Sequence, residues 1–282
     1  MCLRILFGIW FACRFDAGTP LPVRLQTYKM LKRTAVTLVA AALLAPAAFT
    51  QEMPATVPTL DELVAKNIEA KGGAQAVRAL QSLRRTGAML VNEGRIRLAY
   101  TQIKKRPLEV RTEATLQGMT AVQAFDGKEG WQISPFQGRK DPERMSADDV
   151  KALMEDAEMD GPLVDWKEKG STIEYLGTED VDGTQAYKIK VTRKNGDVNF
   201  VYLDPDHFLE IRILTQRIQQ GALVETETDL GDYEKINGVF VPFSIEAGSK
   251  GDSDKQKIVI DKAEGNAPVD DPIFHFPTTP AK

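Results

Sequence analysis

Apolar and polar residues alternate along most of the chain, in short runs that are separated by turn residues. Between residues 82 and 134 the runs are interrupted at 92–94, 117–118 and 126–127, and the same rhythm resumes after residue 171. Two of the later turns, at 195–196 and 237–238, are Asn-Gly, which between alternating runs is the strongest local signal for a β-hairpin. The pattern predicts about ten to twelve antiparallel strands, each joined to the next by a short turn.

Near residue 60 the pattern follows the helical period instead. Thr59 and Glu62 have the spacing of a reciprocal helix cap, and apolar residues from 60 to 68 then lie on one helical face before Gly72 and Gly73 end the helix. A second short helix is expected over residues 74–80. Both helices precede the first predicted strand.

A helical insert at residues 146–170 separates the two sets of strands. Ser146 is suited to cap a helix, and Val150, Leu153, Met154 and Ala157 form one apolar face. The remainder of the insert adds further apolar residues near 163–166. We therefore expect a covering element in the middle of the chain.

A long antiparallel meander must hide its apolar face. It can close into a barrel, fold over as a sandwich, or curl around a helix that covers its open side. The insert favours the third arrangement, so we expect a mainly β fold with a few helices, in which a curved antiparallel sheet forms a half-open barrel under a helical lid. Alternation alone leaves open whether the inner face is packed solid or encloses vacant apolar space.

Residues 30–50 have the layout of a secretory signal. Lys32 and Arg33 precede an apolar run that Pro46 interrupts and that ends in small residues. Cleavage after Thr50 suits this pattern, cleavage after Ala47 is the alternative, and a retained membrane anchor is the other interpretation. Residues 1–29 precede this signal and its methionine, so we interpret them as an extension from a start codon assigned too early. Residues 51–282 are expected to form one exported domain.

Composition excludes several classes of function. Both cysteines, Cys2 and Cys13, lie before the predicted signal, so residues 51–282 offer no thiol nucleophile, disulfide or cysteine-based zinc site. Lipidation of Cys13 is an alternative that would use the short apolar region before it. The formal net charge is −4 and no basic stripe is evident, which argues against nucleic acid as a partner.

Catalytic motifs are absent from the sequence. The two histidines, His207 and His275, have no partner at a metal-ligand spacing, and neither His-Glu-x-x-His nor Gly-x-Ser-x-Gly occurs. The densest polar cluster, residues 204–207, is interpreted as a turn, with a metal site as the alternative. We predict a protein that is not an enzyme and has no cofactor or metal; an unrecognised hydrolase is the alternative.

Three short motifs, in this order, carry a family resemblance. They are Lys105-Arg106-Pro107, the stretch DGKEGWQISPF at 126–136 and IFHFP at 273–277. Together they resemble the LolA/LolB-like family of periplasmic carriers that move lipoproteins to the outer membrane. The opening stretch IEAKGGAQAVRALQSL, at 68–83, resembles a wider group of exported proteins described as outer-membrane lipoprotein-sorting proteins.

The resemblance implies a half-open barrel whose cavity takes the acyl chains of a lipoprotein or of another lipid. It also implies a periplasmic location and transient protein partners in the inner and outer membranes. In the family, an arginine of the Lys-Arg-Pro motif hydrogen-bonds the lid helices in the closed state, and this arginine corresponds to Arg106. Pro107 favours an extended backbone at Arg106, whose guanidinium offers five donors. A sensor that binds lipid or lipoprotein and regulates a membrane partner is the alternative function.

Apolar side chains of the strands and the insert are the predicted ligand-binding residues, with ordinary core packing as the alternative for each. Trp131 is assigned to the cavity wall and Phe136 to its rim, because Pro135 keeps Phe136 out of a regular strand ladder. No catalytic or metal-binding residue is predicted. The full predicted set is Leu98, Tyr100, Arg106, Val110, Trp131, Phe136, Leu153, Met154, Leu163, Trp166, Phe200, Tyr202, Ile211 and Phe243.

Overall fold

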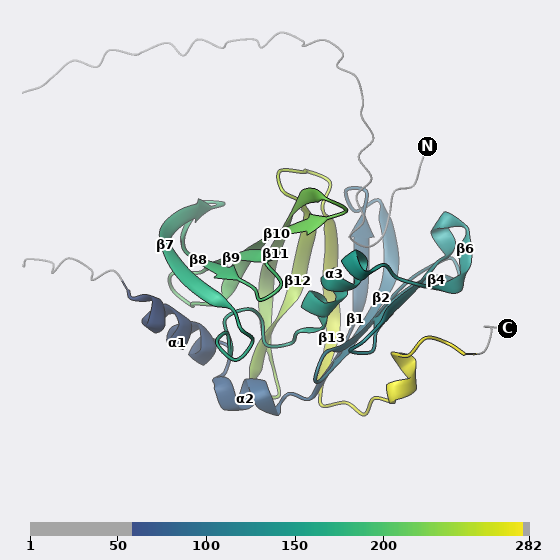
Figure 1. Ribbon diagram of the computed structural model, residues 1–282, viewed down its shortest axis with the longest axis horizontal. Helices are drawn as coiled ribbons and strands as arrows, with labels where there is room; N and C mark the ends of the chain where they lie inside the picture. The colour runs from purple at the N-terminus through teal and green to yellow at the C-terminus, as the bar shows by residue number, and fades with distance from the viewer. Residues whose placement is uncertain (1–57, 279–282) are drawn as a thin grey trace, which may run out of the picture. The chain divides into compact units, whose positions relative to one another are not determined.

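The computed structural model describes residues 58–278, so the predicted signal and the extension before it lie outside the described residues. The described chain contains thirteen strands in one antiparallel sheet, with three α-helices and two short 3-10 helices (Figure 1). The helices are α1 (Leu60–Ala70), α2 (Ala74–Ala79), α3 (Ala147–Ala157), η1 (Pro135–Gln137) and η2 (Asp271–Ile273). The strands are β1 (Ser82–Val91), β2 (Ile96–Lys105), β3 (Glu109–Leu116), β4 (Met119–Phe125), β5 (Gly130–Ser134), β6 (Arg139–Arg144), β7 (Thr172–Val181), β8 (Thr184–Thr192), β9 (Val198–Leu203), β10 (Glu210–Gln219), β11 (Ala222–Ile236), β12 (Val239–Ser249) and β13 (Gln256–Gly265).

Local capping positions two of the helices as the sequence predicts. The Thr59 hydroxyl accepts a hydrogen bond from the Glu62 amide, while the Glu62 carboxylate accepts one from the Thr59 amide at 2.8 Å. The Ser146 hydroxyl likewise accepts a hydrogen bond from the Asp149 amide at the start of α3. Only the first part of the 146–170 insert is helical, and residues 158–170 form an irregular loop.

The alternation of apolar and polar residues does not predict strand β6. Its sequence, RKDPER, has no apolar residue apart from Pro142, and it lies at one edge of the sheet paired with β5 alone. Charged residues and proline are typical of edge strands, because they prevent the free edge from pairing with another chain.

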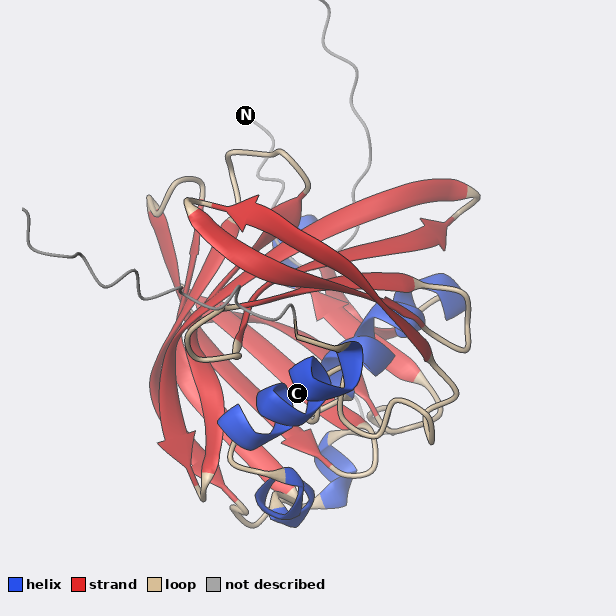
Figure 2. Ribbon diagram, turned by 90° about the vertical axis from the view of Figure 1, so that its left-hand side faces the viewer, coloured by secondary structure: helices blue, strands red, loops and turns tan. Residues whose placement is uncertain are grey.

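Sheet order explains why the insert becomes a cover. The order is β6-β5-β4-β3-β2-β1-β13-β12-β11-β10-β9-β8-β7, so the two meanders join through the β1–β13 pair. Strands β6 and β7, which the insert connects, therefore lie at opposite edges of the sheet. The chain has to return across the whole sheet, and Figure 2 shows the curved strands wrapping around the helices on one side. The sheet is curved and not closed into a barrel, as expected.

Register assigns side chains to two faces. Tyr100 lies opposite Ala114 and Lys104 lies opposite Val110, so these four side chains share the face that the helices cover, which we call the concave face. Apolar side chains there form three clusters: one on β1, β2, β12 and β13 with α2, one on β8 and β9 with α1, and one on β3 and β4 with α3. The core is thus divided among the covering helices.

The opposite, convex face carries two smaller apolar clusters and a C-terminal strap, residues 267–278. The strap lies over β2, β3 and β5: Arg111 donates a hydrogen bond to the Ile273 carbonyl at 2.8 Å, and the Trp131 indole N–H donates one to the Phe274 carbonyl at 2.7 Å. Phe274 is fully buried. Within residues 58–278, no helix has the length and apolar character needed to cross a membrane.

Candidate functional site

The candidate site is the concave face together with the segment that covers it, residues 146–170, which we call the lid. Its helix, α3, packs on β3, β4 and β5 through Val150, Leu153 and Ala157, which meet Val110 and Phe125 of the sheet. A side chain at Gly130 would come within 2.9 Å of Val150. The helix therefore lies directly against the strands at this end.

The irregular part of the lid inserts two aliphatic side chains into the concave face. Leu163 joins the cluster of α1, β8 and β9, and the next residue, Val164, joins the central cluster. Both side chains are fully buried, although the loop that carries them has no regular secondary structure. This pair links two of the three concave-face clusters.

Arg106 connects the lid to α2. It donates hydrogen bonds to the carbonyls of Leu80 at 2.8 Å and Val77 at 2.9 Å, at the C-terminal end of α2, and its guanidinium makes a two-pronged ion pair with Asp160 of the lid. The hydrogen bonds that Arg106 donates to Asp160 raise the pKa of Arg106. One side chain thus satisfies carbonyls at a helix end and holds the lid.

A second ion pair lies next to this one. The Lys71 ammonium, at the end of α1, contacts the Glu210 carboxylate at 2.6 Å and donates to the Asp160 carbonyl at 3.1 Å. Glu210 is 3% exposed, and its own carbonyl accepts a hydrogen bond from the Tyr233 hydroxyl at 2.7 Å. Burial raises the pKa of Tyr233. These contacts, which we call the latch, join α1, α2, the turn after β2 and β10 to the lid.

Gly161 allows the lid to pass over the Lys71 ammonium. Its φ is +78°, and a Cβ atom there would lie 2.8 Å from that ammonium nitrogen. We expect Gly161→Ala to destabilise the closed lid by about 1–2 kcal/mol, because an L side chain is strained in the left-handed region. Limited proteolysis within 158–170 should become faster, whereas Gly183→Ala, in an open hairpin turn with φ +90°, should leave that rate unchanged.

A polar layer lies between α3 and the sheet. Adjacent lid residues point to different parts of the sheet: Asp156 accepts hydrogen bonds from Lys104 and Gln102, both at 2.9 Å, and Glu155 accepts one from Asn199 at 2.6 Å. Glu155 is also paired with Arg217. Polar contacts therefore attach α3 to the sheet in addition to its apolar packing.

Most of the predicted site residues lie on or over the concave face. Leu98, Tyr100 and Phe243 are in the central cluster, with Phe136 packed against it. The remaining members lie in the lid or at its contacts: Arg106, Val110, Leu153, Leu163 and Trp166. Met154 does not join them, because it is 43% exposed on the outer side of α3.

Trp131 is placed differently from the prediction. It lies opposite Ala124 on the convex face, where it packs with Val122 and meets the Phe276 ring edge-on at 6.4 Å. Trp131 is thus under the C-terminal strap rather than in a cavity wall. The physical reason is strand parity, since neighbouring residues of β5 point to opposite faces.

Phe200, Tyr202 and Ile211 also lie on the convex face, in the cluster around Leu214. Strand β9 is apolar on both sides, with Val201 and Leu203 in the concave cluster of α1. The alternation of residues divides the side chains of β9 correctly into two sets, but it does not indicate which set lies on the concave face. The prediction for these three residues is corrected accordingly.

Sequence reasoning missed several residues of this site. Val164, Asp160, Lys71 and Glu210 were not predicted, although Lys71 lies in the stretch that carries the wider family resemblance. A sequence signal existed only for Val164, which is next to Leu163 in an apolar pair. The three ionic residues come together through tertiary contacts alone.

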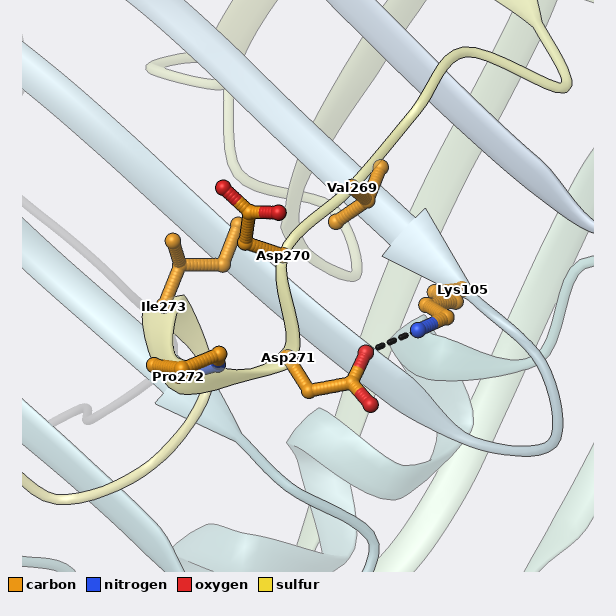
Figure 3. Close-up of a pocket in the computed structure, with 6 residues that line it drawn as sticks. All are labelled: Lys105, Val269, Asp270, Asp271, Pro272 and Ile273. Carbon is orange, nitrogen blue, oxygen red and sulfur yellow. Dashed lines mark hydrogen bonds and ion pairs between the residues drawn. The ribbon is translucent and has the colours of Figure 1, made fainter.

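Within residues 58–278, side chains of α1, α2 and the lid pack on the concave face, where the resemblance implies vacant space. A pocket lies elsewhere, between the end of β2 and the C-terminal strap (Figure 3). It is shallow and is lined by Lys105 and residues 269–273, and the Lys105 ammonium is paired with Asp271. This pocket is on the convex side and is not the predicted lipid cavity.

Metal-binding geometry is lacking in the part of the chain that the structure describes: no three His, Cys, Asp or Glu side chains lie close enough together to hold an ion. The cluster at 204–207 is a turn, as predicted. Asp204 accepts hydrogen bonds from the amides of Asp206 at 3.0 Å and His207 at 2.7 Å.

Comparison with solved structures identifies the architecture. A DUF1329 family protein from Desulfovibrio piger matches with a TM-score of 0.52 and 15% identity over 76% of this chain and 96% of that one. A domain from Vibrio parahaemolyticus, described as belonging to an outer membrane lipoprotein-sorting protein, matches with a TM-score of 0.50 and 13% identity, covering 75% and 97%. A LolA superfamily protein from Nitrosomonas europaea matches with a TM-score of 0.51 and 13% identity, covering 78% and 98%.

Sequence comparison gives no such match: no protein-family model and no curated protein matches the chain. The structural matches nevertheless cover nearly the whole of each solved structure. Residues 58–278 therefore adopt the LolA-like fold, as the sequence motifs indicated.

Proposed function

We propose that this protein is an exported, periplasmic carrier that holds acyl chains on its concave face after the lid has moved away. The cargo is a lipoprotein or another acylated lipid, and no catalytic step is involved. The fold supports a carrier, and the three apolar clusters of the concave face supply a surface for hydrocarbon. Residues proposed to contact the chain are Leu98, Tyr100, Val110 and Phe243.

One observation carries the proposal: the fully buried side chains of Leu163 and Val164 belong to an irregular loop, yet they occupy the concave face. A loop attached by hydrogen bonds and ion pairs can leave without unfolding the sheet. Its two aliphatic side chains then vacate the position that we assign to an acyl chain.

The free energies of transfer favour replacing the two lid side chains by an acyl chain. Exposing the two side chains costs about 1.5–3 kcal/mol each. Moving one sixteen-carbon acyl chain out of water gains about 12 kcal/mol, at about 0.8 kcal/mol per methylene. A bound chain therefore more than offsets the exposure of these two side chains, and the several kcal/mol that remain act against the contacts of α3 and of the latch that opening also breaks.

Binding of lipid is the direct test. The protein, purified from the periplasm of cells that express the full chain, should contain extractable acyl lipid by mass spectrometry and should bind a fluorescent fatty acid. Leu163→Asp should increase access to the concave face, because the lid then loses its apolar anchor. Leu223→Ala, at a residue that is 59% exposed, is the control. If neither native lipid nor fatty-acid binding is found, the carrier function is excluded and a sensor on the same fold becomes the better interpretation.

Arg106→Leu tests the latch. Loss of the ion pair with Asp160 and of the bonds to α2 should shift the lid towards the open state, and each 1.4 kcal/mol lost from closure raises the open population about tenfold. Stopped-flow measurement should therefore show faster association of a fluorescent fatty acid. Arg106→Lys should restore the charge but not the two-pronged pairing, so its rate should be intermediate. Arg95→Leu, at an exposed pair, is the control; an Arg106→Leu rate equal to that of the control would remove Arg106 from the gating step.

A further inference from the structure

The concave face contains two buried cations that are poorly balanced in charge. Arg85 of β1 is 6% exposed and Lys104 of β2 is 8% exposed, and both belong to the face on which we propose that acyl chains bind. Buried charged side chains normally have an opposite charge close by, because an unpaired charge is costly to bury. The negative charge close to Arg85 and Lys104 is smaller than their combined positive charge.

Arg85 has a glutamine as its hydrogen-bond partner. It donates to the Gln102 side-chain oxygen, and its Nε has no hydrogen-bond partner within the described residues. The nitrogen of Gln102 donates in turn to Thr112 at 3.2 Å and to Asp156 at 2.9 Å. Within residues 58–278, no ion pair joins Arg85 to a carboxylate.

Lys104 depends on the lid for its counter-charge. Its ammonium contacts the Asp156 carboxylate at 2.9 Å, and the Asp156 side chain is 41% exposed. Burial lowers the pKa of Lys104, and Arg85 adds to this effect, against the opposing attraction of Asp156. The carboxylate that pairs with Lys104, and that Arg85 reaches only through Gln102, therefore belongs to the lid.

The other polar contacts of the lid differ in this respect. Arg193 and Arg217 meet Glu155 and Glu158 of the lid, but Asp197 of the β8–β9 turn, which pairs with Arg217 at 3.7 Å and also attracts Arg193, is not part of the lid. These cations keep a negative neighbour when the lid leaves. Among the cations of the sheet that lie beside α3, the deficit is thus confined to Arg85 and Lys104.

We infer that Arg85, Gln102 and Lys104 form a subsite for the anionic head group, a carboxylate or a phosphate, of an acyl-bearing ligand. The inference rests on the proposed carrier function. The head group replaces the Asp156 carboxylate of the lid, so it receives the hydrogen bonds of Gln102 and Lys104 and adds a partner for Arg85. The neighbouring apolar clusters, around Leu98 and around Val110, receive the hydrocarbon.

Because the head group takes the place of the Asp156 carboxylate, binding of the ligand is coupled to opening of the lid. The closed lid acts as an internal anion on this subsite, so an anionic ligand competes with the lid while a neutral one leaves the two cations without a counter-charge. The structure therefore favours anionic over neutral amphiphiles of the same chain length.

Calorimetric titration of the purified full protein with decanoate, decyl phosphate and decanol tests the subsite. Both anions should bind about tenfold to a hundredfold more tightly than decanol, which corresponds to one or two charge-assisted hydrogen bonds. The stronger of the two anions identifies the head-group class, and raising the salt concentration should reduce the preference. Acetate and inorganic phosphate alone should bind far more weakly, because they lack the chain.

Lys104→Met should reduce decanoate and decyl phosphate affinity to that of decanol, without weakening decanol binding. It leaves Asp156, which is already partly exposed, without a buried partner, so folding should persist and is checked by circular dichroism. Lys262→Met makes the same change in charge at an exposed position of β13 and should preserve the preference. Equal binding of decanol and the anions by the unaltered protein, or a preference that survives Lys104→Met, overturns the subsite while leaving the carrier intact. Absence of binding by all three ligands overturns both.

Discussion

Trp131→Ala should lower the free energy of unfolding by about 3–5 kcal/mol, the range for removing a large buried aromatic side chain. Trp131 is 1% exposed, packs with Val122 and Phe276, and holds the C-terminal strap through the Phe274 carbonyl. Its loss leaves a cavity and an unsatisfied buried carbonyl. Chemical denaturation followed by circular dichroism measures the effect.

The same variant distinguishes structural from ligand-binding aromatics. Because Trp131 lies on the convex face, fatty-acid affinity measured well below the unfolding transition should be unchanged. Trp131→Phe keeps most of the bulk and loses only the indole donor, so it should cost about 1–3 kcal/mol. A tenfold loss of fatty-acid affinity in Trp131→Ala, with the protein still folded, would place the indole in the binding site after all and contradict the assignment of faces.

Lys71→Met is the second change with a large expected effect. It leaves the Glu210 carboxylate, 3% exposed, without its cation, and breaking a buried pair by removing one partner costs about 3–5 kcal/mol. It also removes a donor to the Asp160 carbonyl of the lid. We expect a lower urea midpoint and, below it, faster proteolysis of the lid.

The double variant Lys71→Met/Glu210→Gln separates the ionic contribution from lost packing. Removing the orphaned charge should recover more than half of the destabilisation, since most of the cost arises from burying an unpaired carboxylate. Lys128→Met, in an exposed turn, should have almost no effect. If the double variant is no more stable than Lys71→Met alone, the buried charge is not the cause of the loss.

The sequence divides the side chains of each strand into two sets, one for each face of the sheet, but it does not indicate which set faces the helices. In β9, Phe200 and Tyr202 alternate with Val201 and Leu203, and both sets are apolar. A period of two separates the sets, but nothing local says which one faces the helices. The choice depends on the direction in which the whole sheet curves, and this is why Trp131, Phe200, Tyr202 and Ile211 were assigned to the wrong face.

The latch could not be predicted for a different reason. Arg106 was identified through its motif, but its carboxylate partner, Asp160, is 54 positions away, and Lys71 meets Glu210 across 139 positions. Charged residues are common along the chain, so no local pattern distinguishes these from solvated ones. The order of the strands in the sheet, and the path of the lid across it, bring them together.

The sequence by itself determined the local structure: helix starts at Thr59 and Ser146, most hairpin turns, and the mainly antiparallel character of the chain. These follow from capping, turn chemistry and alternation, which act between residues a few positions apart. Tertiary structure decided the rest. Only the pairing of β1 with β13 places β6 and β7 at opposite edges, and this forces residues 146–170 across the concave face and brings Asp156 against Lys104. Such contacts depend on how distant strands pair, so they arise only when the whole sheet has formed.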